Sequence, residues 1–321
     1  MPEPGTGPNA CGAMAGDLRT ILEKLDPRID LVISGHTHRA YVCDFSAVDP
    51  SRRFKVTSAG FGGTMLTDIA LTIDPRLNDV TAVSARNVPV QSPGEGRPAN
   101  PAFPTFEPDG AMAAYVARYV TAAADVANRP VGRISASAPR AAPESQIGNL
   151  IADSQLAATR PAGAQIALMN PGGVRSDLAA REGGTVTYGD LYAVQPFGNT
   201  LVTMTYTGEQ LLRILEEQFV NPNDENILSV SEGFTMTLDP ARPAGQRVVA
   251  AALNGTPIDR AASYRVTLNS FIASGGDGFA SFKEGSDATT GPVDLDAIEA
   301  YLRARDVVPV PAIGRVTLLS R

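Results

Sequence analysis

The chain of 321 residues has no tryptophan, and it has no run of the ~20 apolar residues that would be needed to cross a bilayer. Its N-terminus, Met-Pro-Glu-Pro-Gly-Thr-Gly-Pro, has neither the basic start nor the apolar stretch of a signal peptide. The net charge of −7 argues against a nucleic-acid groove or an anionic membrane surface as the main partner. These absences favour a soluble chain with no nucleic-acid or membrane partner.

Cysteine is nearly as scarce, since only Cys11 and Cys43 occur. One interpretation is a pair of small buried thiols. The other is a disulfide, which would indicate an oxidising compartment. Two cysteines are too few to decide between them.

The chain also has only two histidines, His36 and His38, and both follow the apolar segment 31–33, a predicted short buried strand. In an extended segment, residues two apart point the same way. Neutral imidazole suits Zn, Mn, Fe and similar divalent ions. The spacing therefore favours a metal site over two polar turn residues that happen to be histidine.

The length suggests about two domains of roughly 150 residues each. Pro, Gly and Asn are frequent in 91–108, which predicts a linker, and 109–127 is predicted as an Ala-rich helix bridging two domains. Before the linker, the patterns predict a helix at 17–25 and strands at 31–33, 54–58 and 65–73. After it, they predict helices at 146–158, 208–219 and 294–305, and strands at 165–169, 201–206, 234–238, 247–253, 264–268 and 314–319. The region 131–321 is therefore predicted to be a mixed α/β domain long enough to bury its own core.

A glycine-rich stretch at 269–279, Asn-Ser-Phe-Ile-Ala-Ser-Gly-Gly-Asp-Gly-Phe, is the most informative segment. Three glycines within four residues allow a tight turn and a close approach to a ligand. They set Asp277 between two aromatic residues. Phe271 here, and Phe197 in Gln-Pro-Phe-Gly-Asn, would each be assigned to a core if taken alone, but the neighbouring glycines favour loops.

A third segment, Asn170-Pro-Gly-Gly-Val-Arg175, ends a predicted strand. The guanidinium of Arg175 suits bidentate contacts to phosphate or ribose oxygens. Proline at position 171 stiffens the turn and removes one backbone N–H.

Together with Ser-Gly-His-Thr-His at 34–38, these three segments resemble, in the same order, the motifs of the 5'-nucleotidase family. The resemblance runs from about residue 9 to 316. It implies an α/β (α+β) fold with three parts. These are the C-terminal remnant of a metallophosphoesterase β-sandwich (1–90), a linker and bridging helix (91–130), and a mixed-sheet nucleotide-binding C-terminal domain (131–321).

The family's substrate-binding positions match Phe197, Phe271, Asp277, Arg175, Asn170, Arg140 and Asn199. By resemblance, the two phenylalanine rings sandwich the base, Asn170 helps to hold it and Asp277 accepts from ribose hydroxyls. Base stacking of this kind contributes ~1–3 kcal/mol and tolerates different bases. The two arginines would contact the sugar–phosphate, and Asn199 would line the pocket or form the turn. The segment of Arg140 differs from the family by about one residue in spacing.

The resemblance further implies two divalent metal ions, Zn, Mn or similar, held in part by His36 and His38. The family's other metal-binding motifs, Asp-x-His and Gly-Asn-His-Glu, do not precede Gly35. We therefore expect an N-terminally truncated and catalytically incomplete form of a periplasmic or extracellular enzyme that converts nucleoside monophosphates to nucleoside and phosphate. The alternatives are a non-catalytic nucleotide-binding module, and a UDP-sugar or 2',3'-cyclic nucleotide hydrolase. A thiosulfohydrolase of the sulfur-oxidation branch is disfavoured by the paired phenylalanines.

Overall fold

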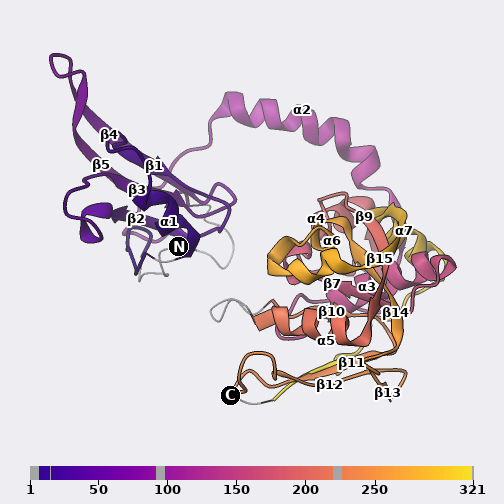
Figure 1. Ribbon diagram of the computed structural model, residues 1–321. Helices are drawn as coiled ribbons and strands as arrows, with labels where there is room; N and C mark the ends of the chain where they lie inside the picture. The colour runs from indigo at the N-terminus through magenta and orange to yellow at the C-terminus, as the bar shows by residue number, and fades with distance from the viewer. Residues whose placement is uncertain (1–6, 15, 92–97, 220–225, 320–321) are drawn as a thin grey trace. The chain divides into compact units, whose positions relative to one another are not determined.

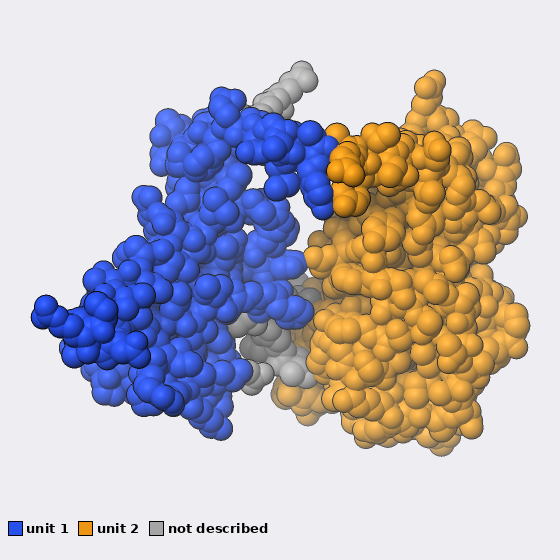
Figure 2. Space-filling model, turned by 90° about the horizontal axis from the view of Figure 1, so that it is seen from above, with its two compact units in different colours: residues 1–115 blue, residues 116–321 orange. Residues whose placement is uncertain are grey.

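A computed structural model describes residues 7–14, 16–91, 98–219 and 226–319 (Figure 1). It divides into two compact units, Met1–Tyr115 and Val116–Arg321, coloured separately in Figure 2. The division falls within helix α2, which spans Gly110–Ala127. The observed helix confirms the one predicted at 109–127. Part of the predicted linker, 92–97, and the first six residues lie outside the described part; residues 98–109 form no helix or strand. No helix among the described residues is long and apolar enough to cross a membrane.

The first unit contains a three-stranded sheet and a separate hairpin. The sheet has the order β1-β3-β2, with β1 and β3 parallel, and β4 and β5 form the hairpin. The elements are α1 (Gly16–Glu23), β1 (Leu31–Ile33), β2 (Ala40–Asp44), β3 (Lys55–Ala59), β4 (Met65–Asp74) and β5 (Asp79–Pro89). The predicted helix and all three predicted strands of this region are confirmed.

A disulfide joins Cys11 to Cys43 of β2, with the two Cα atoms 5.1 Å apart. Cys43 lies in a small core beside Phe45 and Phe54, whose stacked ring centroids are 4.5 Å apart. The structure therefore supports the disulfide rather than two free thiols. The bond fastens the segment before α1 to the sheet.

Strand β1 was predicted to be buried, and this was wrong. Leu31 and Val32 are half-buried, and Ile33 is 69% exposed. Among the described strands it pairs with β3 alone, so it lies at the edge of its sheet. An apolar run of three residues cannot distinguish such an edge position from a central one.

The second unit is built around a five-stranded mixed sheet with the order β10-β7-β14-β9-β15. Strands β7 and β14 are parallel, and the other neighbours are antiparallel. A four-stranded sheet, β13-β12-β11-β16, and a pair, β6-β8, complete it. The strands are β6 (Pro130–Arg133), β7 (Ile166–Met169), β8 (Thr185–Thr187), β9 (Thr200–Thr207), β10 (Ser229–Val230), β11 (Phe234–Leu238), β12 (Val248–Leu253), β13 (Thr256–Pro257), β14 (Ser263–Asn269), β15 (Ser286–Val293) and β16 (Val316–Leu318). The helices are α3 (Gln146–Thr159), α4 (Tyr188–Val194), α5 (Gly208–Glu216), α6 (Ser270–Ala273) and α7 (Asp294–Arg303).

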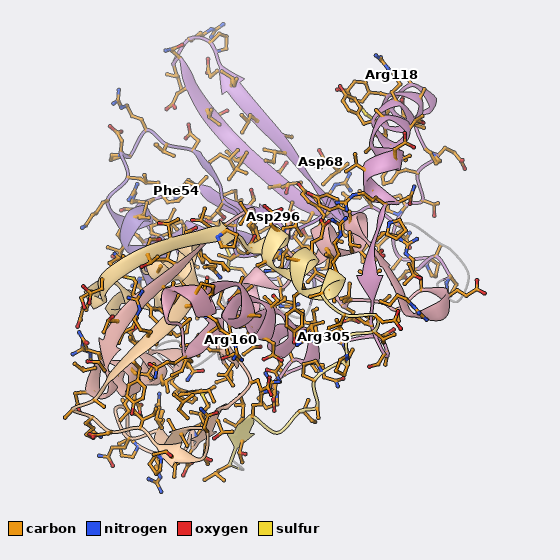
Figure 3. The ribbon with its side chains drawn as sticks, turned by 90° about the vertical axis from the view of Figure 1, so that its right-hand side faces the viewer. Phe54, Asp68, Arg118, Arg160, Asp296 and Arg305 are labelled. Carbon is orange, nitrogen blue, oxygen red and sulfur yellow. A yellow bond between two sulfur atoms is a disulfide. The ribbon has the colours of Figure 1, made fainter. Side chains whose placement is uncertain are left out.

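The five-stranded sheet is covered on both faces. Ile166 and Leu168 of β7 pack with α5 and β11, whereas Met169 packs with α3 and α7. Helices α3 and α7 form the layer on the Met169 face; in Figure 3, Asp296 marks α7 and Arg160 marks the end of α3. Burial on both faces explains why β7 is a continuous apolar run. The predicted mixed α/β architecture, with every predicted helix and strand of this region, is confirmed.

Candidate functional site

The sheet topology brings the three glycine-rich segments to one edge. Strands β7 and β14 are parallel, so the segments that follow them, beginning at Asn170 and at Ser270 of α6, leave the same edge. Strand β9 is antiparallel to β14 with Leu201 opposite Asn269, so the loop that contains Phe197 enters β9 at that edge too. Segments about 30 and 100 residues apart therefore meet because of strand direction.

The loop that follows β14 holds Asp277 in a left-handed conformation, with φ of 54°. One carboxylate oxygen, Oδ2, accepts a 2.6 Å hydrogen bond from Asn170 Nδ2. The main-chain oxygen of Asp277 accepts a hydrogen bond from Asn226 Nδ2 at 3.0 Å. A Cβ on Gly172 would lie only 2.9 Å from Oδ2, so a larger residue there would displace the Asp277 carboxylate.

Asn170 lies behind this carboxylate and not on the surface. It is 1% exposed, and its Oδ1 accepts from Asn269 Nδ2 at 2.8 Å. Asn269 is equally buried, and its Oδ1 accepts from the backbone N–H of Ile272 at 3.1 Å. Asn269 was part of the quoted motif, but no role was predicted for it.

The two phenylalanines proposed to sandwich a base are exposed, Phe197 by 57% and Phe271 by 46%. Neither belongs to the core, in agreement with their glycine-rich setting. The guanidinium carbon of Arg175 lies 5.8 Å from the centroid of the Phe197 ring, a cation–π distance. The Phe271 ring lies over Gly276, where a Cβ would come within 2.6 Å of it.

Asn199 connects the two aromatic loops with α7. Its Oδ1 accepts from Ser270 Oγ at 3.3 Å, and its Nδ2 donates to Asp294 Oδ2 at 3.4 Å. Its main-chain oxygen accepts from the Asp294 N–H at 2.8 Å. Burial raises the pKa of Asp294 more than these hydrogen bonds lower it. The contacts make Asn199 a connector of loops, and Ser270 and Asp294 were not predicted.

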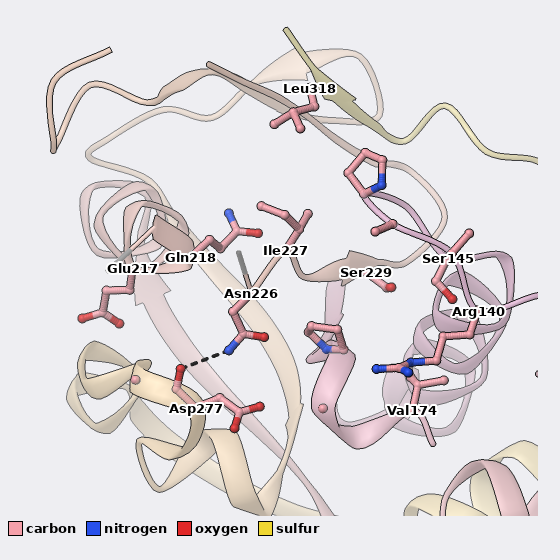
Figure 4. A pocket seen from close by; sticks show the side chains of 16 residues that line it. Arg140, Ser145, Val174, Glu217, Gln218, Asn226, Ile227, Ser229, Asp277 and Leu318 are labelled. Carbon is pink, nitrogen blue, oxygen red and sulfur yellow. Dashed lines mark hydrogen bonds between the residues drawn. The ribbon is translucent and has the colours of Figure 1, made fainter. Parts of the chain in front are cut away.

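A cavity of about 930 Å³ lies beside Asp277 (Figure 4). Arg140 and Asp277 both line it, together with Pro171 and Asn226. The phenylalanines are not among its lining residues. The structure thus gathers the predicted residues at one sheet edge, with Asp277 shared between the aromatic loops and the cavity.

The segment after Arg140, which resembles the family's Gly-Asn-Leu region, has a structural role. Glu144 accepts from Asn149 Nδ2 at 2.7 Å and from the backbone N–H groups of residues 314, 315 and 316. Burial raises the pKa of Glu144, but these hydrogen bonds outweigh it, so the net direction is downward. A Cβ on Gly148 would collide with the Ser229 hydroxyl. This motif therefore fastens α3 to β16 and β10.

The two histidines lie in an exposed turn and not in an extended segment, so that prediction was wrong. His36 and His38 have left-handed φ of 71° and 61°, and the Thr37 N–H bonds to the Gly35 carbonyl. The His38 ring stacks on Phe61, with centroids 4.9 Å apart. Within the described ranges, no three His, Cys, Asp or Glu residues are grouped to hold a metal ion. The described residues therefore do not by themselves supply the ligands of a two-metal centre.

The comparisons with known proteins agree with the fold. The family model "5'-nucleotidase, C-terminal domain" matches residues 121–284. A 5'-nucleotidase precursor from Thermus thermophilus superposes with a TM-score of 0.66 at 27% identity, over 91% of this chain and 60% of that one. The chain belongs to the 5'-nucleotidase family and includes its C-terminal domain.

Two curated relatives extend the similarity to most of this chain. Endonuclease YhcR of Bacillus subtilis is 29% identical over 301 residues, covering 92% of this chain. Cell wall protein Lmo0130 of Listeria monocytogenes is 26% identical over 313 residues, covering 94%. The chain spans 22% and 38% of the lengths of these two relatives. Hydrolytic nucleotidases among the family's members support a nucleotide phosphoesterase at the level of the family.

Proposed function

We propose that the second unit binds a nucleotide at the edge where β7 and β14 end and β9 begins. The observation that supports this most strongly is the meeting of three loops there, with two exposed phenylalanines and the Asp277 carboxylate. A single exposed aromatic ring is ordinary on a protein surface, so what favours a ligand site is two such rings on loops that also carry a carboxylate. Aromatic faces stack on bases, and a carboxylate accepts from sugar hydroxyls.

Most of the predicted residues then have a role that suits their place. Phe197 and Phe271 stack on the base, and Asp277 accepts from the ribose. Among the described residues, the Arg140 guanidinium makes no hydrogen bond or ion pair, and only its backbone N–H bonds Asp177, so the guanidinium can meet a phosphate. Arg175 lies over a ring face, from which its guanidinium can contact the sugar–phosphate.

We further infer that the whole protein hydrolyses a nucleotide phosphoester with two divalent metal ions, to which His36 and His38 supply ligands. When bound, such ions would polarise the phosphate and activate water. The described residues give no third ligand nearby, so we expect this chain alone to bind without turnover. Its disulfide, together with a relative named as a cell wall protein, supports export to an oxidising compartment.

Calorimetric titration of AMP and adenosine, with and without Mn²⁺, combined with a phosphate-release assay, tests both parts. We expect saturable binding without release. Phe106→Ala, at a similarly exposed ring outside the second unit, should leave affinity unchanged. Lack of binding would reject the nucleotide site, whereas turnover would reject catalytic incompleteness. Binding without turnover in a longer form of the protein would favour the alternative, a non-catalytic nucleotide-binding module.

A further inference from the structure

Two buried asparagines form a hydrogen-bonded series that ends on the ligand-facing carboxylate. Asn269 Nδ2 donates to Asn170 Oδ1 at 2.8 Å, and Asn170 Nδ2 donates to Asp277 Oδ2 at 2.6 Å. The series begins at the Ile272 N–H, which donates to Asn269 Oδ1 at 3.1 Å. Strand β7, strand β14 and the loop after α6 are thereby connected through side chains alone.

The direction of this series is fixed by its two ends. A backbone N–H can only donate and an ionised carboxylate can only accept. Asn269 must therefore turn its oxygen toward Ile272 and its amino group toward Asn170. Asn170 must in turn present its amino group to Asp277. Neither amide can flip without losing hydrogen bonds at both of its atoms.

The series addresses a specific difficulty at Asp277. The residue has a left-handed backbone and follows two glycines, so its own loop does little to fix the direction of its side chain. The hydrogen bond to Oδ2 supplies that direction. Among the described residues, no hydrogen bond reaches Oδ1, which leaves this oxygen for a ligand that donates.

We propose that Asn170 and Asn269 are positioning residues that orient Asp277 toward ribose hydroxyls. This rests on the proposed nucleotide site. Both asparagines are 1% exposed, and both side-chain atoms of each are already hydrogen-bonded.

The test measures the ratio of the dissociation constants for 2',3'-dideoxyadenosine and adenosine. In the unaltered chain we expect about tenfold or more, the usual size for hydrogen bonds to a charged group. Asn269→Ser keeps an oxygen for the Ile272 N–H but loses the donor to Asn170. Asn269→Asp places a carboxylate oxygen against Asn170 Oδ1, which is also an acceptor. The Asn170 amide should then flip and no longer donate to Asp277. Both variants should bring the ratio to about that of Asp277→Asn while leaving dideoxyadenosine affinity unchanged.

Asn149→Ser is the matched control, because Asn149 is also buried but bonds Glu144 outside the series. It should keep the ratio of the unaltered chain. The proposal is overturned if the Asn269 variants, folded by thermal melting, keep that ratio. It is also overturned if Asn170→Ala changes the preference for adenosine over inosine and leaves the ribose ratio intact. If the unaltered chain binds neither nucleoside, the proposed function itself fails, a result distinct from binding with an unchanged ratio.

Discussion

Gly276→Ala should weaken nucleoside binding through the Phe271 ring alone. A Cβ on Gly276 would lie 2.6 Å from two ring atoms and 2.8 Å from a third, so the ring must move by roughly 1 Å to reach ordinary contact distance. Gly276 does not have a left-handed φ, so alanine adds no backbone strain there. Stacking on one ring is worth ~1–3 kcal/mol, and a displaced ring keeps part of that. We expect a loss of about 1 kcal/mol, or about fivefold in Kd.

A double-mutant cycle, measured by calorimetry with adenosine, isolates this effect. Phe271→Ala should cost ~1–3 kcal/mol by itself, and Gly276→Ala should then add almost nothing because its methyl group has room. Gly110→Ala, where a Cβ would touch nothing and φ is not left-handed, is the control and should have no effect. The reasoning is refuted if Gly276→Ala lowers the binding free energy equally in the unaltered chain and in Phe271→Ala. It is also refuted if Gly276→Ala leaves the affinity of the unaltered chain unchanged.

Three further predictions concern stability and pH, and hydrogen exchange measures the opening free energy in each of them. Glu144→Gln removes an acceptor that serves two backbone N–H groups, and should lower the opening free energy of α3 and β16 by about 2 kcal/mol. Hydrogen bonds hold the pKa of Glu144 below its usual range, so the stability that its carboxylate contributes is fully present above the ordinary carboxyl pKa of about 4 and is lost as the pH falls further. Equal pH profiles of stability in the unaltered chain and in Glu144→Gln would contradict this. Reduction of Cys11–Cys43, or serine at both positions, should destabilise the first unit by about 2–4 kcal/mol and leave nucleoside affinity intact; unchanged exchange in β2 would contradict the structural role. Burial raises the pKa of Asp294, so stability near β15 should fall as pH rises between its ordinary and raised values, and Asp294→Asn should abolish that fall.

The sequence predicted many elements with strong apolar periodicity, but it missed the alternating strand β2 and several polar strands. Strand β15, Ser-Asp-Ala-Thr-Thr-Gly-Pro-Val, is polar and largely exposed, so it exists because it pairs with β9. The two-residue strand β10 is likewise defined by its partner β7. The turn at His36–His38 was misjudged because spacing alone implies a direction only if the backbone is extended.

The candidate residues were predictable as a set, but their contacts were not. Asn269 lies 99 residues from its partner Asn170, and Asn199 lies 95 residues from Asp294. Nothing local in the sequence indicates that an asparagine of one motif bonds a carboxylate of another. That contact depends on how the strands bring the two loops together.

The site also depends on strand register, which a buried set of hydroxyl groups helps to fix. Thr267 of β14 lies opposite Thr203 of β9, and their Oγ1 atoms are 2.8 Å apart. The Thr267 hydroxyl also bonds Thr159 of α3 at 2.6 Å. A shift of one residue would turn these threonines to the other face of the sheet and leave buried hydroxyls unpaired, at a cost of about 1–3 kcal/mol each. The same shift would move the Phe197 loop relative to Asn269. The polar contacts inside the sheet therefore help to set the spacing of the loops on which nucleotide binding would depend.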